Sequence, residues 1–185
     1  MISHGLLNEA KSEIKKICHD LSGFGERDII MGVEPSEVLV WRDEAKNLIN
    51  KKIPNVLLIE ELLLRLDQMK ALPRFEILEK KVWVFEHCHQ KSLAETKNLI
   101  EALKIILKLE IEVIDTGCCG MAGDFGYKFS QVSNTIAHQS FDKYIKKIHK
   151  NDILIATGTS CRKQILDIFS INSIHLPQLF FNAVK

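Results

Sequence analysis

Residues 82–89, Val82-Trp83-Val84-Phe85-Glu86-His87-Cys88-His89, place four apolar side chains directly before a loop with a cysteine between two histidines. A short apolar run bounded by polar residues is typical of a buried strand. Similar runs at Ile111–Ile114, Ile153–Ala156 and Ser173–Leu176 predict further strands. Helices are predicted between and after these runs, over Ser92–Leu107, Ser130–Ile148 and Cys161–Phe169.

This alternation of strands and helices predicts the fold class. Strands that alternate with helices form right-handed crossovers and a mostly parallel sheet. We therefore expect an α/β fold with helices on both faces of the sheet, in a three-layer, Rossmann-like arrangement. The pattern predicts that this α/β domain covers residues 73–185.

The first 72 residues are predicted to form a helix-rich N-terminal flank with one strand. Apolar residues at helical spacing, a short apolar run and a leucine-rich run predict a helix over Leu6–Leu21, a strand over Ile29–Val33, and helices over Glu37–Asn50 and Asn55–Lys70. Ser36 is the expected N-cap of the second helix, because serine side chains accept hydrogen bonds from first-turn amides. The leucine-rich helix is expected either to be deeply buried or to dock on another protein.

Length and composition exclude several classes of protein. The chain has 185 residues, a formal charge of +1 and 46% hydrophobic residues. Enough apolar residues are present for a core, and the near-zero charge argues against a nucleic-acid partner. No apolar run has the roughly 18 residues that a membrane helix needs, and no signal peptide is recognisable, so we expect a cytoplasmic protein. An odd number of cysteines, five, argues against a closed disulfide framework.

Four of the five cysteines are predicted to lie at one edge of the sheet. Cys88 follows the first strand of the α/β domain, Cys118 and Cys119 follow the second, and Cys161 follows the third. The carboxyl ends of parallel strands meet at one edge, which is where α/β proteins bind ligands. Cys18 instead lies on the apolar face of the first helix, where a buried thiol acts as a small hydrophobic side chain.

Clustered thiols are typical of a soft metal centre, because thiolates are the usual ligands of zinc and of iron–sulfur clusters. The chain has no Cys-x-x-Cys motif, and adjacent cysteines fit two corners of one tetrahedron poorly but can bind different iron atoms. This favours an iron–sulfur cluster over zinc. Cysteines without a ligand, and a redox-active disulfide between Cys118 and Cys119, stay open as alternatives.

The same loops contain further candidate residues. Gly117, Gly120 and Gly158 are predicted cofactor-binding positions, because glycine lets the backbone approach a ligand closely. No residue has a firm catalytic assignment. His87 and His89 are candidate ligands or proton carriers, or they hydrogen-bond within the loop. Arg162 is a candidate for binding an anion or balancing the charge of a cluster, or it is a solvated residue of the first helical turn.

Three motifs carry a family resemblance, together with the shorter stretches Gly32–Ser36 and Arg42–Glu44. The motifs are His87-Cys88-His89-Gln90-Lys91, the segment Asp115–Tyr127 with Gly117-Cys118-Cys119-Gly120, and Thr157-Gly158-Thr159-Ser160-Cys161-Arg162-Lys163-Gln164-Ile165. They resemble the cysteine-rich CCG domain at the C-terminus of large FAD-linked dehydrogenases of the D-lactate and D-2-hydroxyglutarate type. That domain is similar to the cysteine-rich part of heterodisulfide reductase and to the iron–sulfur component of glycolate oxidase.

The resemblance implies a function in electron transfer. It implies that the chain is a C-terminal domain or fragment of an FAD-linked 2-hydroxy-acid oxidoreductase and is not catalytically complete alone. Residues 1–72 then correspond to the tail of a preceding CCG module. Cys88, Cys118, Cys119 and Cys161 are the implied ligands of an iron–sulfur cluster, with 4Fe-4S as the favoured type. FAD is expected only in an upstream domain or partner subunit, with a ferredoxin-like iron–sulfur segment as a further partner and a peripheral membrane location through a redox partner.

Two positions depart from the family pattern. Glu37 stands where many relatives have a cysteine, which argues against a site in the preceding module. Gly158 stands where the widespread form of the domain has the first cysteine of a Cys-x-x-Cys pair, which leaves four thiols and argues against a cluster with five. A zinc-stabilised interaction module that docks through the leucine-rich helix, and a vicinal-thiol redox protein, are the alternative functions.

Overall fold

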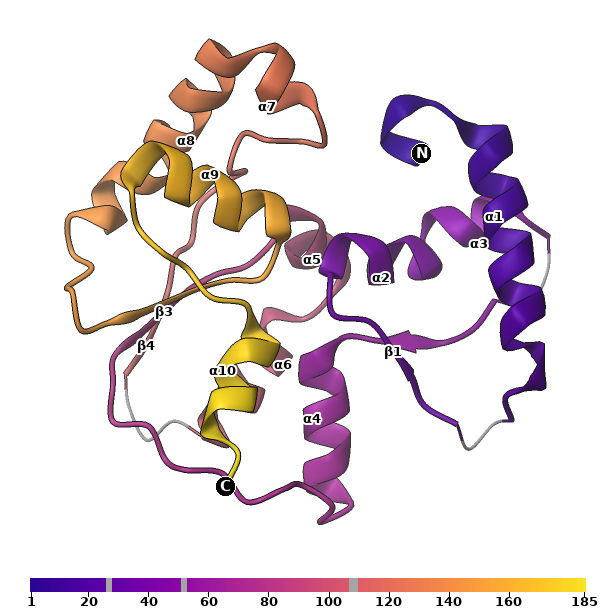
Figure 1. Cartoon of the computed structure of the whole chain (residues 1–185), viewed down its shortest axis with the longest axis horizontal. Helices are drawn as coiled ribbons and strands as arrows, with labels where there is room; N and C mark the ends of the chain where they lie inside the picture. The colour runs from indigo at the N-terminus through magenta and orange to yellow at the C-terminus, as the bar shows by residue number, and fades with distance from the viewer. Residues whose placement is uncertain (26–27, 51–52, 107–109) are drawn as a thin grey trace.

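A three-stranded parallel sheet forms the centre of the part of the chain that the computed structural model describes, namely residues 1–25, 28–50, 53–106 and 110–185 (Figure 1). The strands are β3 (Val82–Phe85), β4 (Ile111–Val113) and β5 (Ile153–Ala156), in the order β4-β3-β5. Val82 lies opposite Ile111 on one side and Ile153 on the other. The carboxyl ends of all three strands therefore point to the same edge.

Helices cover both faces of this sheet, because side chains along β3 alternate between two cores. Val82 and Val84 pack with side chains of α4, α6 and α10, whereas Trp83 and Phe85 pack with α8 and α9. Figure 1 shows α9 and α8 on one side of the strands and α10 beside α4 on the other. The helices of this half are α5 (Cys88–Leu93), α6 (Thr96–Lys104), α7 (Phe125–Lys128), α8 (Ser130–Ile145), α9 (Thr159–Phe169) and α10 (Leu176–Ala183).

The N-terminal residues form mostly helices around a small second sheet. Its two strands, β1 (Ile30–Met31) and β2 (Val56–Leu57), are parallel. The helical elements are η1 (Ile2–His4), α1 (Leu7–Asp20), η2 (Leu21–Gly23), α2 (Pro35–Arg42), α3 (Glu44–Leu48) and α4 (Ile59–Gln68). Leu63 of α4 is buried in the same core as Val82 and Leu99. The leucine-rich helix is therefore partly buried within the chain itself, while the division at residue 72 stays a prediction.

The α/β class is confirmed, with more helix and smaller sheets than the sequence predicted. The predicted helix over Asn55–Lys70 was wrong at its start, because Val56–Leu57 pairs with β1. The predicted strand over Ser173–Leu176 was also wrong: Ile174 forms a single bridge to Ile155, and α10, which was not predicted, begins at Leu176. Pro177 in its first turn suits a helix start, since proline lacks only an amide that needs no partner there.

Two predicted long helices are each divided into two shorter helices in the structure. The helix over Glu37–Asn50 is divided at Asp43, with φ −120° and ψ −79°, and its start lies at Pro35 with Glu34, not Ser36, as N-cap. The helix over Ser92–Leu107 is divided at Ala94 and Glu95, both extended, where Thr96 turns to donate a hydrogen bond to buried Glu86. Its predicted last residue, Leu107, lies outside the described residues.

The central position of Phe85 gives a stability prediction. Its ring is fully buried and makes an edge contact with Phe141, with 4.7 Å between centroids. We expect Phe85→Ala to lower the free energy of unfolding by about 3–5 kcal/mol, since a large buried ring is lost and a cavity remains. Urea denaturation measures this. The matched control, Phe181→Ala, removes a ring that is 79% exposed and should change stability little; equal losses in the two variants would contradict the assigned core.

Candidate metal centre

The four predicted cysteines come together at the carboxyl edge of the main sheet. Cys88 is the first residue of α5, Cys161 is the third residue of α9, and Cys118 and Cys119 lie in the loop after β4. The Cys118 sulfur is within hydrogen-bonding reach of Cys88 and Cys119, and Cys119 is within reach of Cys161. Cys119 and Cys161 are 3% and 1% exposed, whereas Cys88 is exposed. The structure thus unites these thiols in one group that opens to solvent on the Cys88 side.

Hydrogen bonds among the thiols set their protonation. The pKa of Cys118 is lowered because Cys119 and Cys88 stabilise its thiolate, helped by the Gly120 amide 3.3 Å from its sulfur. The pKa of Cys88 and that of Cys119 are raised, mainly by the hydrogen bonds to Cys118, with burial adding to both. The Cys118 thiolate therefore forms readily, whereas Cys88 and Cys119 resist ionisation. A bound metal cation reverses this resistance, because it stabilises every thiolate that it coordinates.

The loop with Cys118 and Cys119 is fixed against α8. Ser140 of α8 donates a hydrogen bond of 2.8 Å to the Cys118 carbonyl. Gly120 has φ +95°, and a Cβ there would lie 2.5 Å from the Ser133 carbonyl oxygen, so only glycine fits. Gly117 has more room, since its nearest neighbour, the Ser140 hydroxyl, would lie 4.0 Å from an added Cβ.

Gly158 brings the loop after β5 into close contact with the loop after β3. A Cβ at this position would lie 2.4 Å from Cδ2 of His87 and 3.2 Å from the Cys161 sulfur. The glycine therefore allows the loops that lead into the helices of Cys88 and Cys161 to approach each other. Whether Gly117, Gly120 or Gly158 contacts a cofactor stays a prediction.

The two histidines next to Cys88 lie in different environments. His87 is in contact with Gly158, its buried Nδ1 has no hydrogen-bond partner among the described residues, and burial lowers its pKa despite the nearby Glu34. His89 faces the start of α3, where its Nε2 lies 3.9 Å from Oε1 of Glu44. Ligand atoms of Asp43, Glu44 and His89 lie within 4.8 Å of one another.

Arg162 is held by the chain itself. Its guanidinium donates to the carbonyls of Ala156 at 2.9 Å and Thr157 at 3.1 Å, and to the Thr159 hydroxyl at 2.9 Å. Its side chain is mostly buried, which lowers its pKa, and it lies beside the Glu34 carboxylate. Arg162 is therefore an ordered residue of the first turn of α9 that binds the end of β5 and the turn after it, and it is not a solvated side chain.

A buried polar chain that the sequence did not predict supports the loop after β3. Gln90 donates to Glu60 of α4, Thr157 donates to Gln90 at 2.7 Å, and the His87 amide donates to Thr157 at 2.8 Å. Burial raises the pKa of Glu60 to about 7. Glu60 lies among leucines in the sequence. A charged residue on such a helix was the only sequence signal for this series of buried hydrogen bonds.

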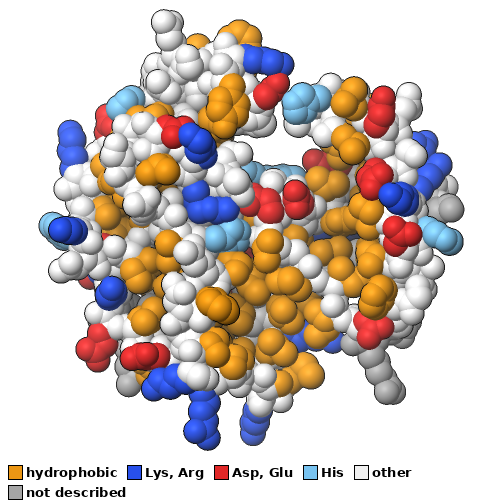
Figure 2. Space-filling model, in the orientation of Figure 1, with side chains coloured by type: hydrophobic (Ala, Val, Ile, Leu, Met, Phe, Trp, Pro, Cys, Tyr) orange, Lys and Arg blue, Asp and Glu red, His pale blue; other side chains and the backbone are white. Residues whose placement is uncertain are grey.

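A cavity of about 800 Å³ adjoins the cysteines (Figure 2). Cys88, Cys118 and Cys119 line one side of it, and apolar residues of α1 and α2, including Ile14 and Trp41, line another. In Figure 2 the molecule is hollowed between the N-terminal residues and the region of α7. The cysteine group is therefore reachable from solvent through a mainly apolar cavity.

Comparison with known proteins agrees with this geometry. Residues 82–166, which include all four clustered cysteines, match the family described as the CCG cysteine-rich domain. The chain contains a CCG domain. No solved structure shows a significant match. No helix within the described residues is both long and apolar enough to cross a membrane.

Relatives of the CCG domain and its flank are parts of larger oxidoreductases. The D-2-hydroxyglutarate dehydrogenase of Pantoea ananatis is 30% identical over 142 residues, covering 74% of this chain and 14% of the relative. The D-2-hydroxyglutarate dehydrogenase of Escherichia coli is 27% identical over 187 residues, which cover 98% of this chain and 18% of the relative. One of the subunits of the anaerobic glycerol-3-phosphate dehydrogenase of Escherichia coli is 36% identical over 124 residues, covering 65% and 30%. The chain thus spans less than a third of each of these proteins.

The raised pKa of Glu60 predicts a pH dependence of stability. Because the folded protein holds this proton more tightly than the unfolded chain, Glu60 lowers stability as the pH rises from about 4.5 to about 7. Glu60→Gln removes the charge and keeps an acceptor for Gln90, so its stability relative to wild type should rise over this range by up to about 3 kcal/mol.

Urea denaturation of both proteins at pH 5 and pH 8 measures the effect. Glu79→Gln is the matched control, since Glu79 is exposed and its difference from wild type should not change with pH. If the difference in stability between Glu60→Gln and wild type is the same at pH 5 and pH 8, Glu60 is ionised in the folded protein at both pH values.

Proposed function

We propose that this chain is an electron-transfer domain in which Cys88, Cys118, Cys119 and Cys161 hold an iron–sulfur cluster, with 4Fe-4S as the favoured type. The single observation that supports this most is the convergence of four thiols from three loops, each within reach of a neighbour. Matches to the CCG domain and to oxidoreductases are consistent with it. A cluster, when bound, accepts and releases single electrons.

The described residues fit such a group in donor chemistry and surroundings. Four sulfurs form a soft ligand set, and the adjacent cysteines suit separate irons. The Gly120 amide already points at a sulfur, and hydrogen bonds to sulfur tune the potential of these centres. Burial of Cys119 and Cys161 excludes water from the inner side of the site. Neutral His87 adds no charge next to Cys88.

We extend the proposal to a parent enzyme, an FAD-linked 2-hydroxy-acid oxidoreductase. Support comes from the D-2-hydroxyglutarate dehydrogenases, which the chain matches over part of their length. In an FAD-linked enzyme the flavin carries out hydride transfer, so an FAD-binding domain or subunit and a ferredoxin-like iron–sulfur segment are the proposed partners, and the chain alone is not expected to oxidise a hydroxy acid. Thiols persist as ligands in a reducing compartment, so we propose the cytoplasm.

Anaerobic reconstitution with iron and sulfide tests the cluster. We expect wild type to bind iron and sulfide and, after reduction, to give an EPR signal. Cys118→Ser and Cys161→Ser should each lose metal affinity by more than the roughly 10–100-fold that changes in outer-shell partners typically cause.

Cys18→Ser is the matched control, because Cys18 packs in a separate hydrophobic cluster with Ile14 and Ala45. It should bind iron like wild type. No iron in wild type, or equal iron in Cys118→Ser and Cys18→Ser, would contradict the proposal. One zinc per chain would instead support the zinc-stabilised module, and a Cys118–Cys119 disulfide found by mass spectrometry would support the vicinal-thiol redox protein.

A further inference from the structure

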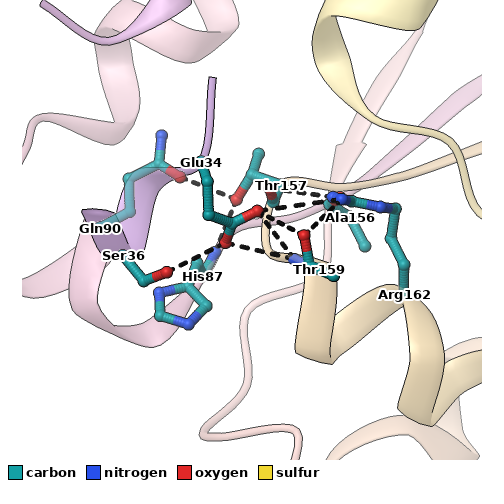
Figure 3. Close-up of polar contacts among 8 residues, drawn as sticks. All are labelled: Glu34, Ser36, His87, Gln90, Ala156, Thr157, Thr159 and Arg162. Atoms are coloured by element: carbon teal, nitrogen blue, oxygen red, sulfur yellow. Dashed lines mark hydrogen bonds and ion pairs between the residues drawn. The ribbon is translucent and has the colours of Figure 1, made fainter. Parts of the chain in front are cut away.

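Glu34, the N-cap residue of α2, contacts Thr159 at the start of α9, the helix that carries Cys161 (Figure 3). The Thr159 amide donates to both oxygens of the Glu34 carboxylate, at 3.2 and 3.1 Å, and the Thr159 hydroxyl donates to one of them at 2.6 Å. Ser36 donates to its other oxygen at 3.1 Å, and the Glu34 side chain is only 16% exposed. Glu34 and Thr159 are 125 positions apart in the sequence.

The start of α9 has no cap of its own. Its N-cap residue is Gly158, which has no side chain to accept a hydrogen bond from the first turn. The first amides of a helix need an acceptor, and the positive end of the helix dipole favours an anion. Glu34 supplies both, so the N-terminal part of the chain provides the cap of α9.

Arg162 binds the same turn and lies 3.9 Å from the Glu34 carboxylate. It donates to the carbonyls of Ala156 and Thr157 while lying beside Glu34 and Thr159. The negative carboxylate and the positive guanidinium therefore enclose the turn between β5 and α9. Arg162 also interacts electrostatically with Cys161, so this pair lies within the field of the cysteine group.

The position of the turn determines the position of Cys161. Gly158 is in contact with both His87 and the Cys161 sulfur, and these contacts leave no space for even a methyl group. A displaced turn would carry Cys161 away from Cys119. We propose that Glu34 is a positioning residue: its carboxylate caps α9 and so holds Cys161 in the cysteine group, and its charge balances Arg162. The charge-balancing part rests on the proposed cluster.

The capping role is tested on the metal-free chain. In Glu34→Ala we expect the Thr159 amide to exchange hydrogen about five- to tenfold faster, the factor that corresponds to a typical capping contribution. Buried Cys161 should react with a thiol reagent faster by a similar factor, while exposed Cys88 serves as the internal reference. Unchanged rates at both positions in a folded variant would overturn the capping role.

Matched variants separate this effect from a general loss of structure. Asp167→Asn removes an exposed carboxylate at the other end of α9, where it pairs with Lys163, and should leave both rates unchanged. Glu34→Gln keeps an acceptor for the Thr159 amide and should fold if Glu34→Ala does not, with a smaller increase in both rates. A Glu34→Gln variant with wild-type rates at both positions would then overturn the role of the charged cap.

The charge-balancing role is tested on the reconstituted protein. Glu34→Gln leaves Arg162 uncompensated, which stabilises the reduced, more negative cluster, so the midpoint potential should rise. Arg162→Gln leaves Glu34 uncompensated, so the potential should fall, and Asp167→Asn should not shift it. Shifts of the same sign, or none, would overturn this role, because a merely structural disturbance gives no opposite signs. If wild type binds no iron, the proposed function fails, while the metal-free experiment still decides the capping role.

Discussion

The parallel pairing of β3 with both of its neighbours is the constraint on which the rest of the structure depends. Since Val82 lies opposite Ile111 and Ile153, the three strands end level with one another. The loops that follow them must therefore start at the same edge. The alternation of side chains along β3 divides the apolar residues between two cores, and helices on both faces shield the strands from water. The edge left open is the one where the thiols gather.

The contacts of the loops bring the thiols together, whereas the hydrogen bonds among the thiols oppose ionisation of Cys88 and Cys119. Packing brings four sulfurs close together, yet the hydrogen bonds to Cys118 that lower its pKa raise the pKa of Cys88 and that of Cys119. The loops themselves are held by neutral or balanced contacts: Ser140 to Cys118, Gly158 against His87, and Glu34 with Arg162. The protein thus positions the cysteine ligands without metal, and a bound metal cation would stabilise their thiolates.

Much of this arrangement could be predicted from the sequence, and the reasons differ between its parts. The strand Val82–Phe85 and the cysteines after three successive strands follow from periodicity and from the geometry of parallel sheets. The break in the helix predicted over Ser92–Leu107 could not be predicted, because it depends on the tertiary contact between Thr96 and Glu86. The contact of Glu34 with Thr159 could not be predicted, since these residues are 125 positions apart in the sequence. The burial of Glu60 could not be predicted either, because it depends on the packing of α4.

The long-range cap on α9 has a consequence for the order of folding. Local contacts such as those within α8 form early, whereas a contact across 125 positions must wait until most of the chain has collapsed. Cys161 therefore gains its final surroundings late, and until then its thiol is open to oxidants and to stray metals. Cys161 is therefore most open to damage during synthesis of the protein, before the Glu34 carboxylate binds the start of α9.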